Sequence, residues 1–240
     1  MGFLTYHLKF RSQKIDENES STGAHVGDVE AIIKCDTPEA PAQVYCEYVA
    51  MRLGTLLGLN IAAGVLVPHR TGLMYASMSI SQVANPLEVV AYENLALFRK
   101  YHPVEAARLA VFDLWIANPD RVGNVLASLR GTTDDIVAAI DSGSCLLNAE
   151  DSKRESLELL WSEDQPDYHA FGAGLPWNYC EETIERIENL SDLAIDDACV
   201  LGDTVGSVML PEQAEVAEVL KWRRSEGRLR RLVRLALKPK

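Results

Sequence analysis

Three polar residues within residues 111–143 have the types and spacing that phosphoryl transfer requires. Asp120 and Asn124 follow an apolar stretch, and Asp141 follows a second, shorter one. In transfer from ATP, a carboxylate orients the attacking hydroxyl, while an Asn and a second Asp hold magnesium against the phosphates. The spacing therefore predicts Asp120 as the catalytic acid and Asn124 and Asp141 as metal ligands. The alternative is that Asn-Pro-Asp only forms a turn there.

Residues upstream could complete a nucleotide site. Lys34 ends the apolar run VEAIIK and could contact the phosphates, and Glu47 lies near the start of the next expected helix, where it could pair with this lysine. Ser21, Thr22 and Gly23 precede that run, and small residues there would let backbone amides approach phosphate. The alternatives are a surface lysine, a solvated glutamate and a plain connector.

The elements that must position these residues follow from hydrophobic periodicity. Strands are expected at 4–10, 29–34, 61–68, 72–79 and 136–140, and helices at 42–57, 87–101, 103–117, 150–161, 180–190, 191–201 and 211–237. Asp113, within the helix expected at 103–117, is interpreted as a structural acid that hydrogen-bonds the loop after it. This order predicts an α+β fold with a small strand-rich part before a larger helical part.

Charge is distributed unevenly along the 240 residues. The last twenty carry nine Lys or Arg and one acid, a formal charge of +8, whereas the other 220 carry −20, which makes the net charge −12. An acidic body repels nucleic-acid phosphates, so general nucleic-acid binding is not expected. The basic end is expected to be an amphipathic helix docked on its own acidic body; the alternative is a surface that binds an anion or nucleic acid.

Composition places the chain in a reducing compartment. Its five cysteines are scattered and form no C-x-x-C pair, which argues against a disulfide framework and a zinc site. No apolar window is long enough to span a membrane, and the first residues lack the features of a signal peptide. A cytoplasmic location without membrane association is therefore expected.

Several segments together resemble the HipA-like serine/threonine kinase family, especially its short members, and more distantly the phosphoinositide 3- and 4-kinases. They are STGAH with GDVEAIIK, CEYVAMRLGTLLGLNIAAGVLV, FDLWIANPDRVGN, AAIDSGSCL and LPEQAEVAEVLKWRRSEGRLRRLV. The resemblance implies a two-lobed protein-kinase-like fold that forms one catalytic unit, with an N-lobe at 1–82 and a C-lobe at 83–240. ATP would lie between the lobes, with residues 78–81 near the hinge.

The resemblance also implies roles and partners. Asp120 would be the catalytic acid, Asn124 and Asp141 would bind Mg²⁺, and Lys34 would bind phosphate, with a protein Ser or Thr hydroxyl as acceptor. Two features depart from the family pattern: Val122 stands where His is common, and Asn124 follows Asp120 one residue early. These departures favour a second hypothesis, a pseudokinase that binds nucleotide or a partner without turnover. The third is an unrelated helical binding protein with an accidental motif match.

Overall fold

The computed structural model describes residues 5–6, 8–14, 25–70, 72–80, 87–130, 136–163, 169–172 and 174–237. Its strands are β1 (Leu8–Lys14), β2 (His25–Val29), β3 (Ala31–Lys34), β4 (Gly64–His69), β5 (Gly72–Met78), β6 (Glu88–Val89), β7 (Val125–Ala127), β8 (Val137–Ala139), β9 (Thr204–Val205) and β10 (Val208–Met209). Its helices are α1 (Gln43–Leu56), α2 (Leu95–Tyr101), α3 (Pro103–Ile116), α4 (Lys153–Trp161), α5 (Trp177–Glu188), α6 (Asp192–Cys199), α7 (Leu210–Arg224) and α8 (Arg228–Ala236). Two 3₁₀ turns, η1 (Tyr92–Asn94) and η2 (Leu146–Asn148), complete the list.

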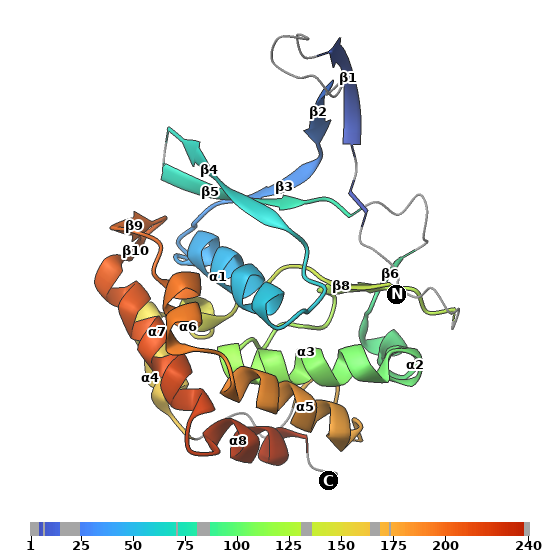
Figure 1. Cartoon of the computed structure of the whole chain (residues 1–240), viewed down its shortest axis with the longest axis vertical. Coiled ribbons are helices and arrows are strands. Elements are labelled where there is room, and N and C mark those ends of the chain that lie inside the picture. Colours follow the sequence, from blue (N-terminus) through green and yellow to red (C-terminus); the bar gives the residue numbers. More distant parts are fainter. Residues whose placement is uncertain are drawn as a thin grey trace.

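The smaller lobe is a three-stranded antiparallel sheet packed on one helix. The strand order is β3-β5-β4, and α1 packs against the sheet (Figure 1). Lys34 pairs in register with Tyr75 on β5, and Tyr75 is buried. Residues paired in this way lie on the same face of a sheet, so Lys34 lies on the face that is directed toward the interior of the protein. The β1–β2 hairpin extends beyond this sheet.

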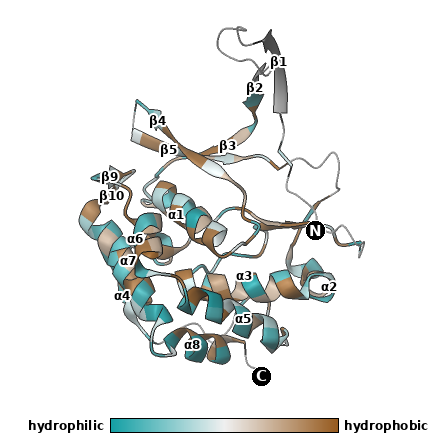
Figure 2. Ribbon diagram, in the orientation of Figure 1, coloured by the Kyte–Doolittle hydropathy of each residue, from teal (hydrophilic) through white to brown (hydrophobic). Residues whose placement is uncertain are grey.

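The larger lobe is built around α3, ten of whose 14 residues are buried. Helices α5, α7 and α8 contact it and show mixed hydrophilic and hydrophobic positions along their lengths (Figure 2). A second small sheet, β6-β7-β8, carries the segment after α3. A parallel bridge from Ile61 to Ala139 joins this sheet to the chain that leaves α1, so the two lobes share backbone hydrogen bonds.

The fold class expected from the sequence is confirmed: strands dominate the first part of the chain and helices the second. Two expected helices were wrong in extent. The helix expected at 87–101 begins only at Leu95, because Glu88 and Val89 pair with β7 instead. The helix expected at 211–237 is two helices, since Glu226 and Gly227 have φ angles of 52° and 69° and end the helical path.

Other expectations fall partly outside the described residues. The strand expected at 4–10 overlaps β1 only from Leu8, because β1 spans Leu8–Lys14 and Tyr6 forms an isolated bridge with Ile80. The boundary expected between residues 82 and 83, and Ser81 of the expected hinge, are not described, so the two-lobe division of the sequence stays a prediction at that point. No helix among the described residues is long and apolar enough to cross a membrane.

The basic C-terminal helix docks on the chain's own body. Leu229 and Val233 of α8 are fully buried. Arg230 Nη2 lies 2.9 Å from Glu181 Oε1 and 3.3 Å from Glu188 Oε2, both on α5. Arg231 pairs with Glu163 at 3.3 Å. This confirms the docked arrangement and shows that the helix uses part of its charge internally.

Candidate active site

One lysine joins the two lobes through two carboxylates. The Lys34 ammonium at the end of β3 forms an ion pair with Glu47 Oε1 on α1 and lies 2.8 Å from Asp141 Oδ1, just after β8. Lys34 and Glu47 are nearly buried, whereas Asp141 is more exposed. The structure therefore brings together three residues that the sequence placed up to 107 positions apart.

The two carboxyl groups hold protons differently. Burial raises the pKa of Glu47 to about 7, and Lys34 only partly offsets that effect. Burial would also raise the pKa of Asp141, but hydrogen bonds from Glu47 and Lys34 outweigh it and lower this pKa below its ordinary value. Two carboxyl groups that share one cation divide the proton unequally. Asp141 is thus the member of the pair that favours the ionised form, which is the form that could bind a metal ion.

Asp120 and Asn124 are held side by side in the loop after α3. The Asn124 side-chain amide donates to the Asp120 carbonyl oxygen at 2.8 Å and to Asp120 Oδ2 at 3.2 Å. The Asn124 backbone N–H closes a turn to Arg121 O at 3.1 Å. The loop with the early Asn thus keeps the two side chains in contact. With both amide hydrogens directed at Asp120, Asn124 Oδ1 remains as an acceptor.

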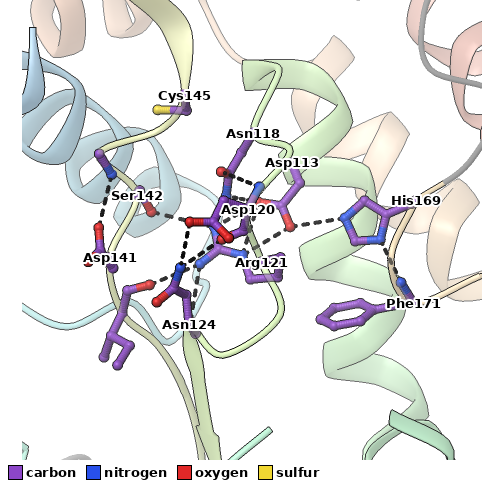
Figure 3. A network of polar contacts seen from close by, with 12 residues as sticks. Asp113, Asn118, Asp120, Arg121, Asn124, Asp141, Ser142, Cys145, His169 and Phe171 are labelled. Atoms are coloured by element: carbon purple, nitrogen blue, oxygen red, sulfur yellow. Dashed lines mark hydrogen bonds and ion pairs between the residues drawn. The ribbon is translucent and has the colours of Figure 1, made fainter. Parts of the chain in front are cut away.

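A fully buried arginine ties this loop to the segment that carries Asp141. Arg121 makes three contacts of 2.7–3.1 Å with the Asp113 carboxylate on α3 (Figure 3). Its other donors reach Ile140 O at 3.2 Å and Ser142 Oγ at 3.4 Å. A bidentate arginine–carboxylate pair has one favoured geometry. Arg121 therefore sets the position of the neighbouring Asp120 relative to Asp141.

His169 completes this network from a distant part of the chain. Phe171 N–H donates to His169 Nδ1 at 3.1 Å, so the opposite nitrogen carries the hydrogen and donates to Asp113 Oδ2 at 3.1 Å (Figure 3). Burial alone would raise the pKa of Asp113, but Arg121 and His169 hold it below its ordinary value. The expectation that Asp113 is a structural acid is confirmed. The roles of Arg121 and His169 were not predicted: Arg121 follows Asp120 in the segment that resembles the kinase family, but nothing in the sequence indicates its burial or its pairing with Asp113, and a lone histidine carries no local signal.

The backbone around Asp141 is shaped for close approach. Asp141 has a φ angle of 48°, a left-handed conformation that is uncommon outside glycine and that gathers at functional sites. A Cβ at Gly143 would lie 3.1 Å from Gln43 Cγ and 3.3 Å from Glu47 Oε1. Glycine at this position lets the strand-end segment pass against α1, which keeps Asp141 within reach of Lys34.

A second buried arginine supports the helix from which the loop emerges. Arg223 on α7 donates to Leu114 O at 2.6 Å, Trp115 O at 3.0 Å and Leu160 O at 2.8 Å. The first two are among the last carbonyls of α3, which have no partner within the helix. Burial lowers the pKa of Arg223 to about 10. Trp115 Nε1 also donates to Leu220 O at 3.1 Å, so α7 fixes the end of α3 through two side chains.

The donor set suits Mg²⁺ better than a metal that needs a full protein cage. Among the described residues no group of three or more His, Cys, Asp or Glu side chains could hold a metal ion. Mg²⁺ usually takes one or two protein oxygens and completes its shell with water and substrate phosphates. The Asp141 carboxylate and the Asn124 carboxamide oxygen would provide two hard ligands of that kind. The predicted residues Ser21, Thr22 and Gly23 lie outside the described residues.

Comparison with known structures establishes the fold. The crystal structure of the Helicobacter pylori proinflammatory kinase CtkA matches with a TM-score of 0.58 and 17% identity over 87% of this chain and 89% of that chain. HipA from a Shewanella oneidensis toxin–antitoxin complex with HipB and operator DNA matches with a TM-score of 0.51 and 14% identity over 85% of this chain. The chain has the fold of a HipA-like kinase.

The likeness is one of structure rather than of sequence. No protein-family model and no curated protein sequence matches the chain. The aligned region covers 61% of the HipA chain. A shared kinase fold overturns the hypothesis of an unrelated helical protein, and the activity must be argued from the residues of the site.

Proposed function

We propose that the protein transfers the terminal phosphate of ATP, with Mg²⁺, to a Ser or Thr hydroxyl on a protein. The observation that carries the proposal is the contact of Lys34 with both Glu47 and Asp141, next to the Asp120–Asn124 pair. A lysine paired with a helix carboxylate and close to a metal-binding aspartate is the arrangement that kinases require for phosphate binding.

Each residue has a physical role in this proposal. Lys34 neutralises phosphate oxygens, and Glu47 holds the lysine in position. Asp141 and Asn124 Oδ1 hold Mg²⁺, which would stabilise negative charge on the phosphates when bound. Asp120 orients the acceptor hydroxyl and accepts its proton. Rate enhancement then arises from positioning and charge neutralisation.

An apolar side chain supports nucleotide binding at the same place. Ile32 lies two residues before Lys34, on the same face of β3, and its side chain is 60% exposed. A large exposed aliphatic side chain beside the phosphate-binding lysine would pack against the adenine ring, and this contact would bury the apolar surface of Ile32. The sequence pattern alone does not show that Ile32 is exposed, because apolar residues in a strand are usually buried.

One contact favours the second function, a nucleotide-binding pseudokinase. The Asn124 amide lies 3.2 Å from Asp120 Oδ2. That oxygen belongs to the carboxylate that an acceptor hydroxyl would need. If the contact persists with nucleotide bound, the protein binds ATP without transferring its phosphate.

The deciding experiment follows labelled terminal phosphate from ATP and Mg²⁺ into the protein or into solution. Wild type is compared with Asp120→Asn, Lys34→Ala and the control Asp197→Asn, which changes an exposed acid on α6. Transfer that is lost in the first two and retained in the control supports the kinase. Equal rates in wild type and Asp120→Asn refute it, and nucleotide binding without turnover in wild type establishes the pseudokinase.

A further inference from the structure

Asp36, two residues after Lys34, contacts both lobes at once. Its Oδ1 accepts a hydrogen bond from Val44 N–H in the first turn of α1 at 2.9 Å. Its Oδ2 accepts from Ser207 N–H, in the tight turn between β9 and β10, at 2.7 Å. Both oxygens of one carboxylate therefore connect the start of α1 to a hairpin that lies 171 residues later in the chain.

The β9–β10 hairpin is fitted closely around this carboxylate. Gly206 has a φ angle of 58°, and a Cβ built on it would lie 2.2 Å from Asp36 Oδ2. Ser207 Oγ donates to Pro41 O, just before α1. Figure 1 shows the hairpin beside the first turn of α1 and above α7. The turn thus binds Asp36 through the backbone N–H of Ser207 and binds Pro41, before α1, through the Ser207 hydroxyl.

The hairpin is itself fixed to the larger lobe. Lys153 on α4 donates to Ser207 O at 3.0 Å and pairs with Glu212 on α7 at 2.7 Å. The start of α1 has a further link to that lobe, because Ala42 N–H donates to Asn148 Oδ1 at 3.1 Å. Asn148 in turn donates to Gly143 O at 3.0 Å, in the segment of Asp141.

These contacts act on the ion pair of the site. Glu47 lies one turn after Val44 on α1, and Asp36 comes two residues after Lys34. In the sequence, Asp36 therefore lies between the two residues that form the ion pair. In kinases the lysine–glutamate pair must be in place for transfer, and the position of this helix controls it. Contacts at the first turn of α1 restrain movement of Glu47, which lies one turn later, away from Lys34.

We propose that Asp36 is a positioning residue, and that the β9–β10 hairpin clamps α1 so that Lys34 and Glu47 stay paired before any nucleotide binds. The inference rests on the proposed function, because it assigns Asp36 an effect on phosphate transfer. The clamp acts through hydrogen bonds to backbone N–H groups, so it needs an acceptor at both oxygens of residue 36.

Two independent perturbations test the clamp. Asp36→Ala removes both acceptors, and Asp36→Asn keeps one and sets an amide against the other N–H. Gly206→Ala pushes a methyl group into Asp36. Matched controls are Asp203→Asn, an exposed acid beside the hairpin, and Gly227→Ala, which carries similar left-handed strain at φ 69° with its nearest neighbour 3.8 Å away.

The measurements are kcat and the KM for ATP in labelled transfer, the unfolding midpoint, and amide hydrogen exchange in α1 and at 204–209. We expect Asp36→Ala and Gly206→Ala to lower kcat/KM by about 10- to 100-fold, since misplacement of about 1 Å can cost that much. Exchange in the first turn of α1 should accelerate, with Asp36→Asn intermediate and both controls like wild type.

The outcomes separate the inference from the proposed function. A wild type that neither binds nor turns over ATP refutes the proposed function, and with it the effect on transfer. An active wild type whose Asp36→Ala variant keeps its kcat/KM and its exchange in α1 overturns the clamp alone. A loss of activity matched by a general fall of the unfolding midpoint and uniform faster exchange also overturns it, because the role of Asp36 would then be structural.

Discussion

The buried pair of Asp113 and Arg121 makes a quantitative prediction about stability. Both side chains have no exposed surface, and the carboxylate receives three guanidinium contacts and one from His169. Asp113→Asn keeps the shape but leaves the arginine without a counter-charge. Breaking a buried pair in this way costs about 3–5 kcal/mol. For a chain of this size that corresponds to a fall of roughly 6–20 °C in the unfolding midpoint.

The assay is urea denaturation of wild type, Asp113→Asn, Arg121→Met and the double variant. Asp113→Asn leaves the buried guanidinium charge of Arg121 unpaired, and Arg121→Met removes that charge. The double variant should therefore lose less unfolding free energy than the sum of the two single variants, with a coupling of roughly 2–3 kcal/mol. If the losses of unfolding free energy in the two single variants simply add in the double variant, the two side chains are not coupled. A loss below about 1 kcal/mol for Asp113→Asn would likewise contradict the stabilisation assigned to the pair.

The pair also predicts the sign of a pH dependence. The folded pKa of Asp113 lies below its ordinary value, so its contribution is complete above the unfolded pKa of about 3.9. As the pH falls through the folded value, the native state loses that contribution. The difference in unfolding free energy between wild type and Asp113→Asn should therefore shrink as the pH drops below about 4. A difference that stays constant there would contradict the ionised state of Asp113.

Three further predictions concern the metal, the network and the tail. Asp141→Asn should weaken ATP binding measured by calorimetry with Mg²⁺ but change it little without the metal; an unchanged Mg²⁺ dependence would remove Asp141 from the metal site. His169→Gln should lower the unfolding free energy by about 1–3 kcal/mol in urea, because Asp113 Oδ2 loses one of its two buried donors and keeps only Arg121 Nε; no loss would mean that His169 is incidental. Leu229→Ala should cost about 2–5 kcal/mol in the same assay. Arg231→Ala, at an exposed ion pair, should cost less than about 1 kcal/mol, and the reverse order would show that charge rather than burial docks α8.

The positions of the candidate site residues were predictable where short segments hold them. Lys34 at a strand end and Asp120 after a helix follow from periodicity, and Asp141 follows a short apolar run. The residues that support the site from a distance were not predictable: His169 lies 56 residues from its partner Asp113, and Ser207 lies 171 residues from its partner Asp36. No local spacing encodes such pairs, because they depend on how the helices of the larger lobe pack.

The two expected helices that were wrong illustrate the same limit. Residues 87–101 have enough apolar content for a helix, yet pairing with β7 takes Glu88 and Val89 into a strand. Tertiary pairing outweighs a weak local preference there. At 211–237 the apolar periodicity continues across the break, and only the left-handed backbone at Glu226 and Gly227 reveals where α8 turns back onto the body.

The contacts from α7 to the end of α3 have a consequence for how the chain is made. Leu114 and Trp115 leave the ribosome more than a hundred residues before Arg223, which later caps their carbonyl groups. At roughly 5–20 residues per second, this interval lasts about 5–20 seconds. Throughout it, the loop of Asp120 has been synthesised but the end of its helix lacks support. The nascent protein therefore cannot support the end of α3, and with it the loop of Asp120, in this way until α7 has been synthesised.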